Sequence, residues 1–319
     1  MTVQEMVVDV FENLAEPSDL EVNATPGDAG TFSIALPGAQ KILHYLNVAQ
    51  TRIANWVYRD GSISRFKSLY SSLYWKSRSN PVYMVVSCDY SSITVLGYAT
   101  GNVDDEFNGW VLKVTDGEGV GQEAIVVDSI VSGSNIQLVL ESDLSTILDT
   151  TSEVTLYRSF AYLSHNVQSG YPGEGDILLH PGEVLMDIIR VSDVTSRSDL
   201  GRSTFGDTYP AVAYETGIPT EYFLYGNKLQ FNAAIEDPRA YEIMYYRNPV
   251  AMVEAGARSE LPEAFHEAIV MYATHKLRVR NGDYDGQYVD KQNLATLMES
   301  IKSEGVLSNE YENGIISVM

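Results

Sequence analysis

The hydrophobic positions of this chain follow a helical spacing at both ends and alternate with polar positions in between. Near the N-terminus, apolar residues recur three and four positions apart, which predicts helices over residues 2–16 and 39–58. Thr2 and Glu5 have the spacing of a capping box, and Pro17 follows the first predicted helix. The two apolar stripes are Met6, Val7, Val10, Phe11 and Leu14 in the first helix, and Ile42, Leu46, Ala49, Ile53 and Trp56 in the second.

The helical spacing returns near the C-terminus, over residues 263–280 and about 288–303. Pro262 precedes the first of these helices and basic residues crowd its last turn, as helix termini favour electrostatically. Its predicted core residues are Phe265, Ile269, Tyr272 and Leu277. Because no helix is apolar on all sides, each must bury one stripe on a partner. We therefore expect the helices of both chain ends to form one helical bundle.

Between about Phe66 and Tyr246 the hydrophobic period changes to two, with Gly, Asp, Ser and Asn clusters as separators, which is typical of strands joined by hairpins. The predicted strands are Tyr83–Ser87, Ile93–Leu96, Trp110–Thr115, Glu123–Asp128, Ile136–Leu140, Val154–Tyr157, Ile188–Val191, Tyr222–Leu224, Lys228–Phe231 and Tyr241–Tyr246. The expected fold class is α+β: a helical bundle from the two ends, with a β-rich middle that contains an inserted small β-barrel or sandwich module.

The pattern divides the chain into six expected segments. They are the N-terminal helices (1–65), a connecting β segment (66–90), the inserted β module (91–158), a β region leading back to the helices (159–250), the C-terminal helices (251–303) and a C-terminal docking tail (304–319).

Acidic residues outnumber basic ones 43 to 21 among 319 residues, for a formal net charge of −22. This balance argues against a free nucleic-acid binder, because phosphate contacts need clustered Lys and Arg. It is compatible with a surface past which DNA slides, and equally with a charge that serves solubility. The single cysteine, Cys88, excludes an intrachain disulfide. The sequence predicts no signal peptide and no membrane-spanning segment.

Two motifs suggest metal sites but lack a ligand. His266-Glu267 begins like a zinc-protease helix, yet the second histidine would fall on Val270, and His275 lies too far along the helix. We expect both histidines to be surface or interface groups. Asn281, Asp283, Asp285 and Gly286 follow the first half of a calcium loop, but Gln292 occupies the position of the bidentate Glu. A turn between two helices is the favoured interpretation.

No pattern of catalytic residues emerges. The glycine run Gly117–Gly121 lies between two predicted strands without a following lysine or helix, so it predicts a hairpin and not a phosphate loop. A carboxylate pair formed only in three dimensions stays open. We expect no enzymatic activity, no cofactor and no metal.

Two segments are candidate partner interfaces. Between Arg52 and Arg78, basic residues are interleaved with aromatic ones, a mixture suited to interface cores; the alternatives are a solvated surface and direct DNA contact. The C-terminal residues carry an apolar tip after a polar hinge, which suits docking on another subunit; the alternative is a frayed terminus. The candidates are Arg52, Trp56, Arg59, Arg65, Lys67 and Trp75 in the first segment, and Ile315, Ile316, Val318 and Met319 in the second.

Three blocks of the chain resemble a head-to-tail adaptor, or connector, protein of a tailed bacteriophage. The first block is VQEMVVDVFENLAEPSDL with GAQKILHYLNVAQTRIANW, the second is GIPTEYFLYGNKLQFNAAIEDPRAYEIMYYRNP, and the third is ELPEAFHEAIVMYATHKLRVRNGDYDGQY. Together they cover roughly 180 residues of the sequence. Their order and spacing, more than any single block, carry the resemblance.

The region around residues 104–158 resembles a small β module of phage structural proteins. Asn108-Gly109, Gly117–Gln122 and Asp149–Ser152 match its usual features, whereas Ser142–Leu144 replaces an expected aromatic-Pro step.

The resemblance implies a virion protein at the head–tail junction, made in the host cytoplasm. It implies a homo-oligomeric ring, usually of twelve copies, that stacks under the portal protein, binds tail or nozzle proteins and lets double-stranded DNA pass without specific binding. The C-terminal segment would engage the portal. Alternatives are a tail tube or terminator protein of a phage, a carbohydrate-binding β protein of a tail fibre with Tyr83, Tyr90, Tyr98 and Tyr157 as a platform, and a free DNA-binding regulator, which the charge disfavours.

Overall fold

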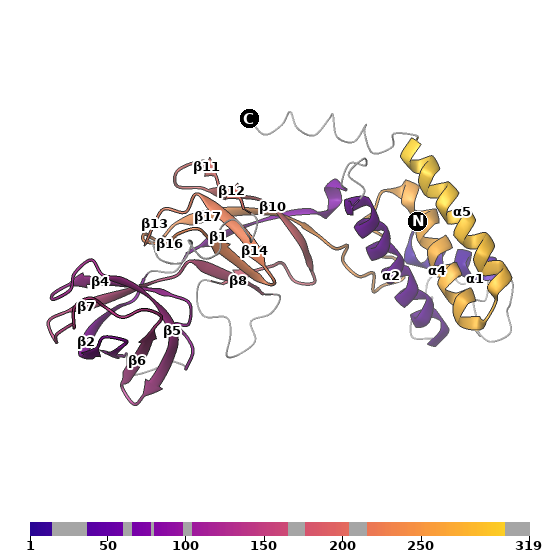
Figure 1. Cartoon of the computed structure of the whole chain (residues 1–319). Helices are drawn as coiled ribbons and strands as arrows, with labels where there is room; N and C mark the ends of the chain where they lie inside the picture. The colour runs from indigo at the N-terminus through magenta and orange to yellow at the C-terminus, as the bar shows by residue number, and fades with distance from the viewer. Residues whose placement is uncertain are drawn as a thin grey trace. The chain divides into compact units, whose positions relative to one another are not determined.

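The computed structural model describes residues 1–14, 37–59, 66–77, 80–97, 104–164, 176–203 and 216–303. It confirms a mixed α+β fold with a β-rich middle (Figure 1). The chain divides into two compact units. Unit 1 comprises Met1–Ser71, Gly182–Met186 and Tyr246–Met319, and unit 2 comprises Ser72–Pro181 and Asp187–Tyr245.

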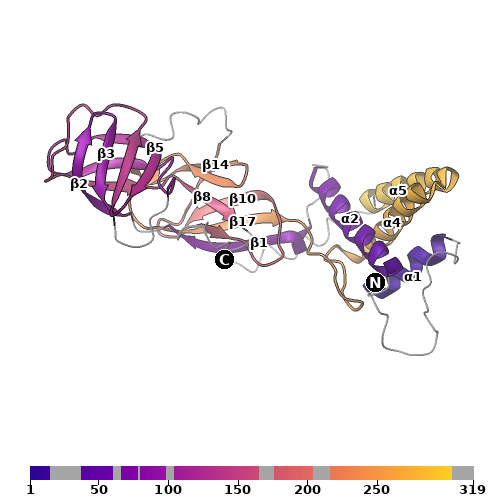
Figure 2. The same ribbon diagram turned by 90° about the horizontal axis from the view of Figure 1, so that it is seen from below.

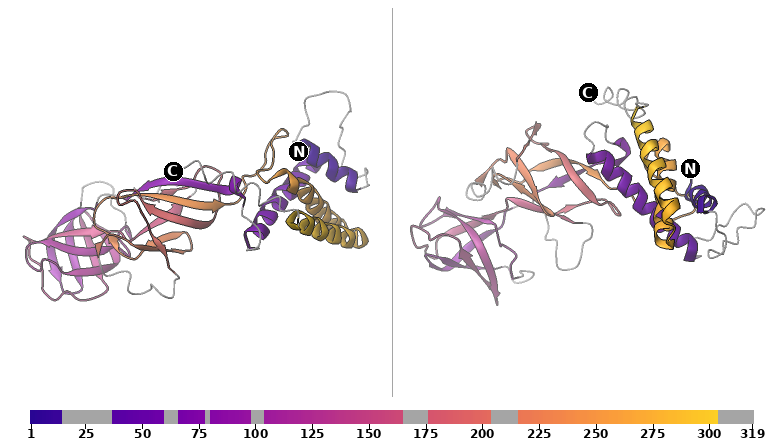
Figure 3. Two further views of the ribbon diagram at one scale, coloured as in Figure 1. Left: turned by 90° about the horizontal axis from the view of Figure 1, so that it is seen from above. Right: turned by 45° about the vertical axis from the view of Figure 1, so that its right-hand side comes forward.

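Unit 1 contains the helices of both chain ends. They are α1 (Val3–Leu14), α2 (Pro37–Arg59), η1 (Lys67–Leu69), η3 (Glu263–Phe265), α4 (His266–Asn281) and α5 (Tyr284–Ser303). Helices α1, α2 and α5 all pack against α4 (Figure 3). The first and last parts of the chain therefore share one core, as the apolar stripes require.

The ends of the helices follow the expected capping chemistry. The Thr2 backbone N–H donates to Glu5 Oε2 at 2.7 Å and the Glu5 N–H donates to Thr2 Oγ1 at 3.3 Å, which confirms the capping box. Gly282 ends α4 in a left-handed conformation, with φ of 79°. The start of α1 is held by the segment before α4, because the Val3 N–H donates to the Ala257 carbonyl at 2.8 Å.

Unit 2 includes a closed six-stranded barrel, in the order β2-β3-β6-β5-β4-β7 (Figure 2). Its strands are β2 (Val82–Asp89), β3 (Ser92–Leu96), β4 (Val111–Asp116), β5 (Glu123–Ser132), β6 (Asn135–Leu140) and β7 (Glu153–Tyr157). Alternate side chains point inward and form one buried cluster that includes Val85, Ile93, Leu112, Leu138 and Leu156. The barrel starts at Val82, so the range 91–158 expected for a module omits β2. Alternation alone does not tell which sheet a strand joins, and β2 pairs with both β3 and β7.

The remaining strands form three small sheets. The first has the order β1-β17-β10-β11, with β1 (Tyr70–Lys76), β17 (Ala240–Arg247), β10 (Leu185–Asp193) and β11 (Ser198–Asp199). The second has the order β12-β14-β15-β8-β9, with β12 (Gly201–Arg202), β14 (Glu221–Tyr225), β15 (Lys228–Phe231), β8 (Phe160–Ser164) and β9 (Ile177–Leu178). The third pairs β13 (Thr216–Gly217) with β16 (Ala234–Ile235). The division between the two units passes through β1, β10 and β17.

Candidate assembly interface

A groove of about 1060 Å³ runs between α2 and α5 in unit 1. Helix α2 contributes residues between His44 and Arg59, among them Ile53 and Trp56 of its apolar stripe, and Tyr272 of α4 contributes to the lining. The groove combines apolar and basic side chains, among them Arg52, Trp56, Arg59, Lys291, Leu294 and Met298. Such a mixture of aromatic, Met and Arg side chains is enriched at the centres of protein interfaces.

The sign of the charge on α2 differs from that of the chain as a whole. Its 23 residues include Lys41, Arg52 and Arg59 but no Asp or Glu. Arg52 and Arg59 are exposed, whereas Ile42 and Leu46 on the buried stripe are fully covered. The groove therefore presents positive charge in a protein with a net charge of −22. Glu299 is its acidic lining residue.

Apart from Trp75, the predicted interface residues separate into three groups. Arg52, Trp56 and Arg59 come together in the groove. Lys67 lies in η1, and its side chain, like the whole of Arg65, lies outside the described residues. The four apolar candidates of the C-terminal tail, from Ile315 to Met319, also lie outside them.

Trp75 is not a surface residue, which corrects its assignment as a partner contact. The side chain is 6% exposed and its ring stacks on Phe231 and Tyr241, with centroid distances of 5.7 and 5.4 Å. It alternates with exposed Tyr74 and Lys76 along β1, so it faces the interior of unit 2. Proximity in sequence to basic residues was a misleading signal here.

The four predicted helix-core residues differ in burial. Phe265, Ile269 and Leu277 are at most 1% exposed, and Phe265 packs edge-on against Phe66 with centroids 4.9 Å apart. Tyr272 is half-buried and lines the groove. One face of α4 thus forms the core while Tyr272 reaches the groove.

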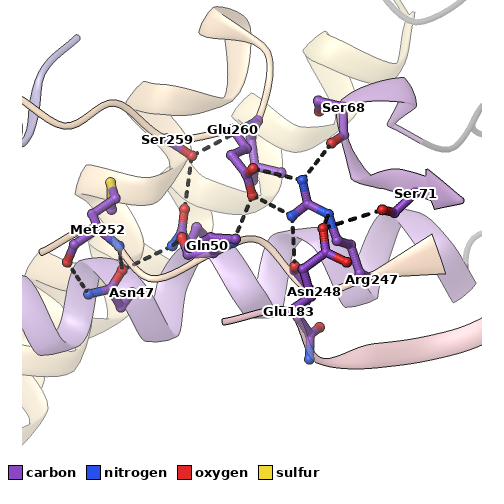
Figure 4. Close-up of polar contacts among 12 residues, drawn as sticks. Asn47, Gln50, Ser68, Ser71, Glu183, Arg247, Asn248, Met252, Ser259 and Glu260 are labelled. Carbon is purple, nitrogen blue, oxygen red and sulfur yellow. Dashed lines mark hydrogen bonds and ion pairs between the residues drawn. The ribbon is translucent and has the colours of Figure 1, made fainter. Parts of the chain in front are cut away.

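A buried cation connects the helices with the end of β17 (Figure 4). Arg247 binds Glu260 through two contacts of 2.8 Å each, and its Nε lies 2.9 Å from Glu183 Oε1. It also donates to the Ser68 carbonyl at 3.2 Å. With only 10% of its side chain exposed, Arg247 needs these two carboxylates to remain charged inside the unit.

Two amide side chains of α2 continue this network (Figure 4). Asn47 exchanges two hydrogen bonds with the backbone of Met252, at 3.0 and 2.8 Å. Gln50 donates to the Val250 carbonyl at 3.0 Å and accepts from the Ser259 hydroxyl at 3.1 Å. These bonds fix the orientation of α2, and Asn47 itself also lines the groove. This network was not predicted from the sequence; the pattern that indicates it is a pair of polar residues three positions apart beside the buried stripe of a helix.

The histidine and calcium-loop motifs have structural roles. His266 is 5% exposed and so does not lie at the surface, one of the two locations expected for it; its Nε2 lies 3.0 Å from the Leu261 carbonyl and its Nδ1 lies 3.0 Å from the Met1 amino group. Burial lowers the pKa of His266. Asp283 caps the start of α5 by accepting from the Gly286 N–H at 3.0 Å. Among the described residues, no group of three His, Cys, Asp or Glu side chains could hold a metal ion.

The barrel offers little to support a carbohydrate platform. Tyr83 and Tyr157 are 4% and 6% exposed, Tyr90 is 48% exposed, and Tyr98 lies outside the described residues. The glycine run Gly117–Gly121 connects antiparallel β4 and β5, which confirms the predicted hairpin. None of the helices in the described ranges is long and apolar enough to cross a membrane.

The comparison with family models gives one finding. The model of the SU10 adaptor protein family matches residues 143–310, just over half of the chain. The matched range includes β14, β15 and β17, the Arg247 network partners Glu183 and Glu260, and both C-terminal helices. No curated protein sequence matches the chain.

Proposed function

The chain belongs to the SU10 adaptor protein family, and from this premise we propose that it joins the portal of a phage capsid to the tail or nozzle. The observation that carries the proposal is the extent of the family match, which runs from the barrel's last strand through the C-terminal helices. The protein is accordingly a phage structural adaptor. Its place in the assembly is the head–tail junction of the virion, after synthesis in the host cytoplasm.

The assembly proposed is a ring, with twelve copies as the expected number. Neighbouring copies would meet through the groove between α2 and α5, where Arg52 and Arg59 suit the acidic surface of another copy. Interfaces of this kind join a cation-rich surface to an anion-rich one. The net charge of −22 means that much of the surface of a neighbouring copy carries carboxylates.

The ring would extend the DNA channel of the portal. A lumen with an excess of carboxylates repels phosphate and so allows DNA to pass without sticking. The acidic composition supports this role, because sequence-specific or tight binding would need clustered Lys and Arg.

The two units would then have different partners. The helices of unit 1 would form the ring body, and the β-rich unit 2 would face the tail or nozzle. We assign the closed barrel to the small β module inserted in phage structural proteins, with a role in decoration or in an additional contact. Residues 304–319 would engage the portal protein.

The copy number of the chain in purified virions tests the proposal. Quantitative mass spectrometry against the portal protein should give near-equal amounts for an adaptor ring. A several-fold excess would instead indicate a tube or a decoration protein, and a small multiple of three would indicate a fibre. Absence from the virion would overturn the structural role altogether.

A further inference from the structure

The groove between α2 and α5 is lined by apolar side chains and by cations. Trp56, Leu294 and Met298 lie along it together with Arg52, Arg59 and Lys291. Side chains of this kind leave the groove suited to an apolar segment that carries negative charge. The groove is open over about 1060 Å³, enough for several side chains of a bound segment.

The segment that follows α5 has the complementary composition. Residues 304–319 include three glutamates, at positions 304, 310 and 312, and no Lys or Arg. Their apolar side chains are Val306, Leu307, Ile315, Ile316, Val318 and Met319. The segment starts after Ser303, four residues beyond Glu299 of the groove. Its chemistry and its point of attachment both match the groove.

We propose that residues 304–319 bind in the α2–α5 groove of their own chain before the protein assembles. The 16 residues can span up to about 50 Å when extended, at about 3.3 Å per residue. The part of α2 that lines the groove, His44 to Arg59, is about 22 Å long at about 1.5 Å per residue. The segment can therefore turn back after α5 and follow the groove over its whole length.

The same chain is favoured over a second copy because of the short tether. A short flexible linker gives an effective concentration of about 1 mM, far above the concentration of free copies in a dilute solution. Occupancy within one chain then requires only that the isolated segment bind with a Kd below about 1 mM.

This docking would shield the cationic face of α2 until a partner removes the segment. That consequence rests on the proposed function, in which the same segment engages the portal and the exposed groove then accepts a neighbouring copy. Docking itself is a property of the free chain, so its test does not involve virions or rings.

Trp56 provides a direct measurement. Trp75 and Trp110 are 6% and 4% exposed, so quenching of tryptophan fluorescence by acrylamide reports mainly on Trp56. Deletion of residues 304–319 should increase the quenching constant. A synthetic peptide of residues 304–319 should restore protection of the truncated chain with saturation below about 1 mM.

Three variants make the result specific. The W56F chain should show no change of quenching on deletion. The R52E/R59E double variant should lose protection in the full chain, whereas K41E, a single charge reversal on α2 away from the groove, should keep it. Unchanged quenching on deletion would overturn the proposal. Protection of the full chain that disappears on dilution would also overturn it, because the segment would then come from a second copy.

Discussion

Arg247 at the end of β17 holds Glu260, thirteen residues later, by two parallel contacts of 2.8 Å between guanidinium and carboxylate. The same guanidinium binds Glu183, a residue that reaches unit 1 from a separate five-residue stretch of the chain. Arg247 also donates to the Ser68 carbonyl at 3.2 Å, so one cation joins three distant parts of the sequence. Bidentate geometry of this kind is specific to arginine.

Replacement of Arg247 by Ala should destabilise the protein strongly, because two partly buried carboxylates would lose their counter-charge. Removal of one partner of a buried ion pair costs about 3–5 kcal/mol, and R247K should recover only part of the loss. Urea unfolding would measure both changes. The control is R190A: Arg190 is 42% exposed and lies 3.5 Å from Glu242, so a cost of about 0–1 kcal/mol is expected. Equal costs for R247A and R190A would contradict the role of Arg247.

Gly117 cannot carry a side chain without displacing the backbone of the barrel. A Cβ at this position would lie 2.5 Å from the Cα of Ser152, and its φ is 81°. Gly121 in the same hairpin has φ of 89° but no atom within 4 Å of an added Cβ. G121A should therefore cost about 1–2 kcal/mol from backbone strain alone, and G117A clearly more. Thermal unfolding would measure the stability lost in each variant, which arises from backbone strain alone in G121A and from strain plus the steric clash with Ser152 in G117A. Equal losses of stability would show that the close approach to Ser152 does not matter.

Lys228 should make stability depend on pH in the alkaline range. Burial, with a smaller effect from nearby Arg158, lowers the pKa of Lys228 from 10.5 to about 8. Its Nζ lies 3.6 Å from the centre of the Phe160 ring, a contact that offsets part of the cost of the charge. Between these two pKa values the unfolded chain binds more protons than the folded chain, so the free energy of unfolding rises with pH. Below about pH 8 the destabilisation from the buried Lys228 charge is present in full.

The variant K228M keeps an aliphatic side chain and removes the charge, so it should be more stable than the original chain at pH 7. The advantage should shrink as pH rises from 8 towards 10.5. Denaturant unfolding at a series of pH values would measure it, with K76M at an exposed position of β1 as the control. An advantage that is constant with pH would mean that packing, and not protonation, is responsible.

Sequence and structure agree where a pattern has one physical cause. The capping box of Thr2 and Glu5, the stripe of α2 and the hairpin around Gly117 are all local, and each was predictable. The Arg247 network was not, because its members come from residues 47–71, 183 and 247–260 and no local rule connects them. Trp75 was predicted to be a partner contact because of its basic neighbours in the sequence. Alternation along β1 decides instead which way its ring points, and it points into the core. The side of the groove that α5 contributes could not be predicted either, because it depends on how α5 packs against the other helices.

Charge reversal of Arg59, Arg65 and Lys67 to Glu should weaken ring assembly without unfolding the chain. Arg59 is exposed in the groove, and a reversed charge there would repel the acidic surface of a neighbour. Sedimentation of the chain with its portal would measure assembly, and circular dichroism would confirm the fold. K76E serves as the control for a single charge reversal at an exposed position in unit 2. Normal assembly of the triple variant would show that this stretch is ordinary surface.

Deletion of residues 315–319 should leave the fold intact and prevent incorporation of the protein into virions. The described core of unit 1 is formed by α1, α2, α4 and α5 without these residues, so circular dichroism and the unfolding midpoint should change little. In the proposed function, Ile315, Ile316, Val318 and Met319 would be the apolar side chains offered to the portal, so incorporation should fail without them. Replacement of these four residues by Ser should have the same effect at full length, whereas S317A, which keeps all four, should have none. Incorporation at the normal level after the deletion would exclude the segment as the portal contact and leave binding in the α2–α5 groove as its remaining role.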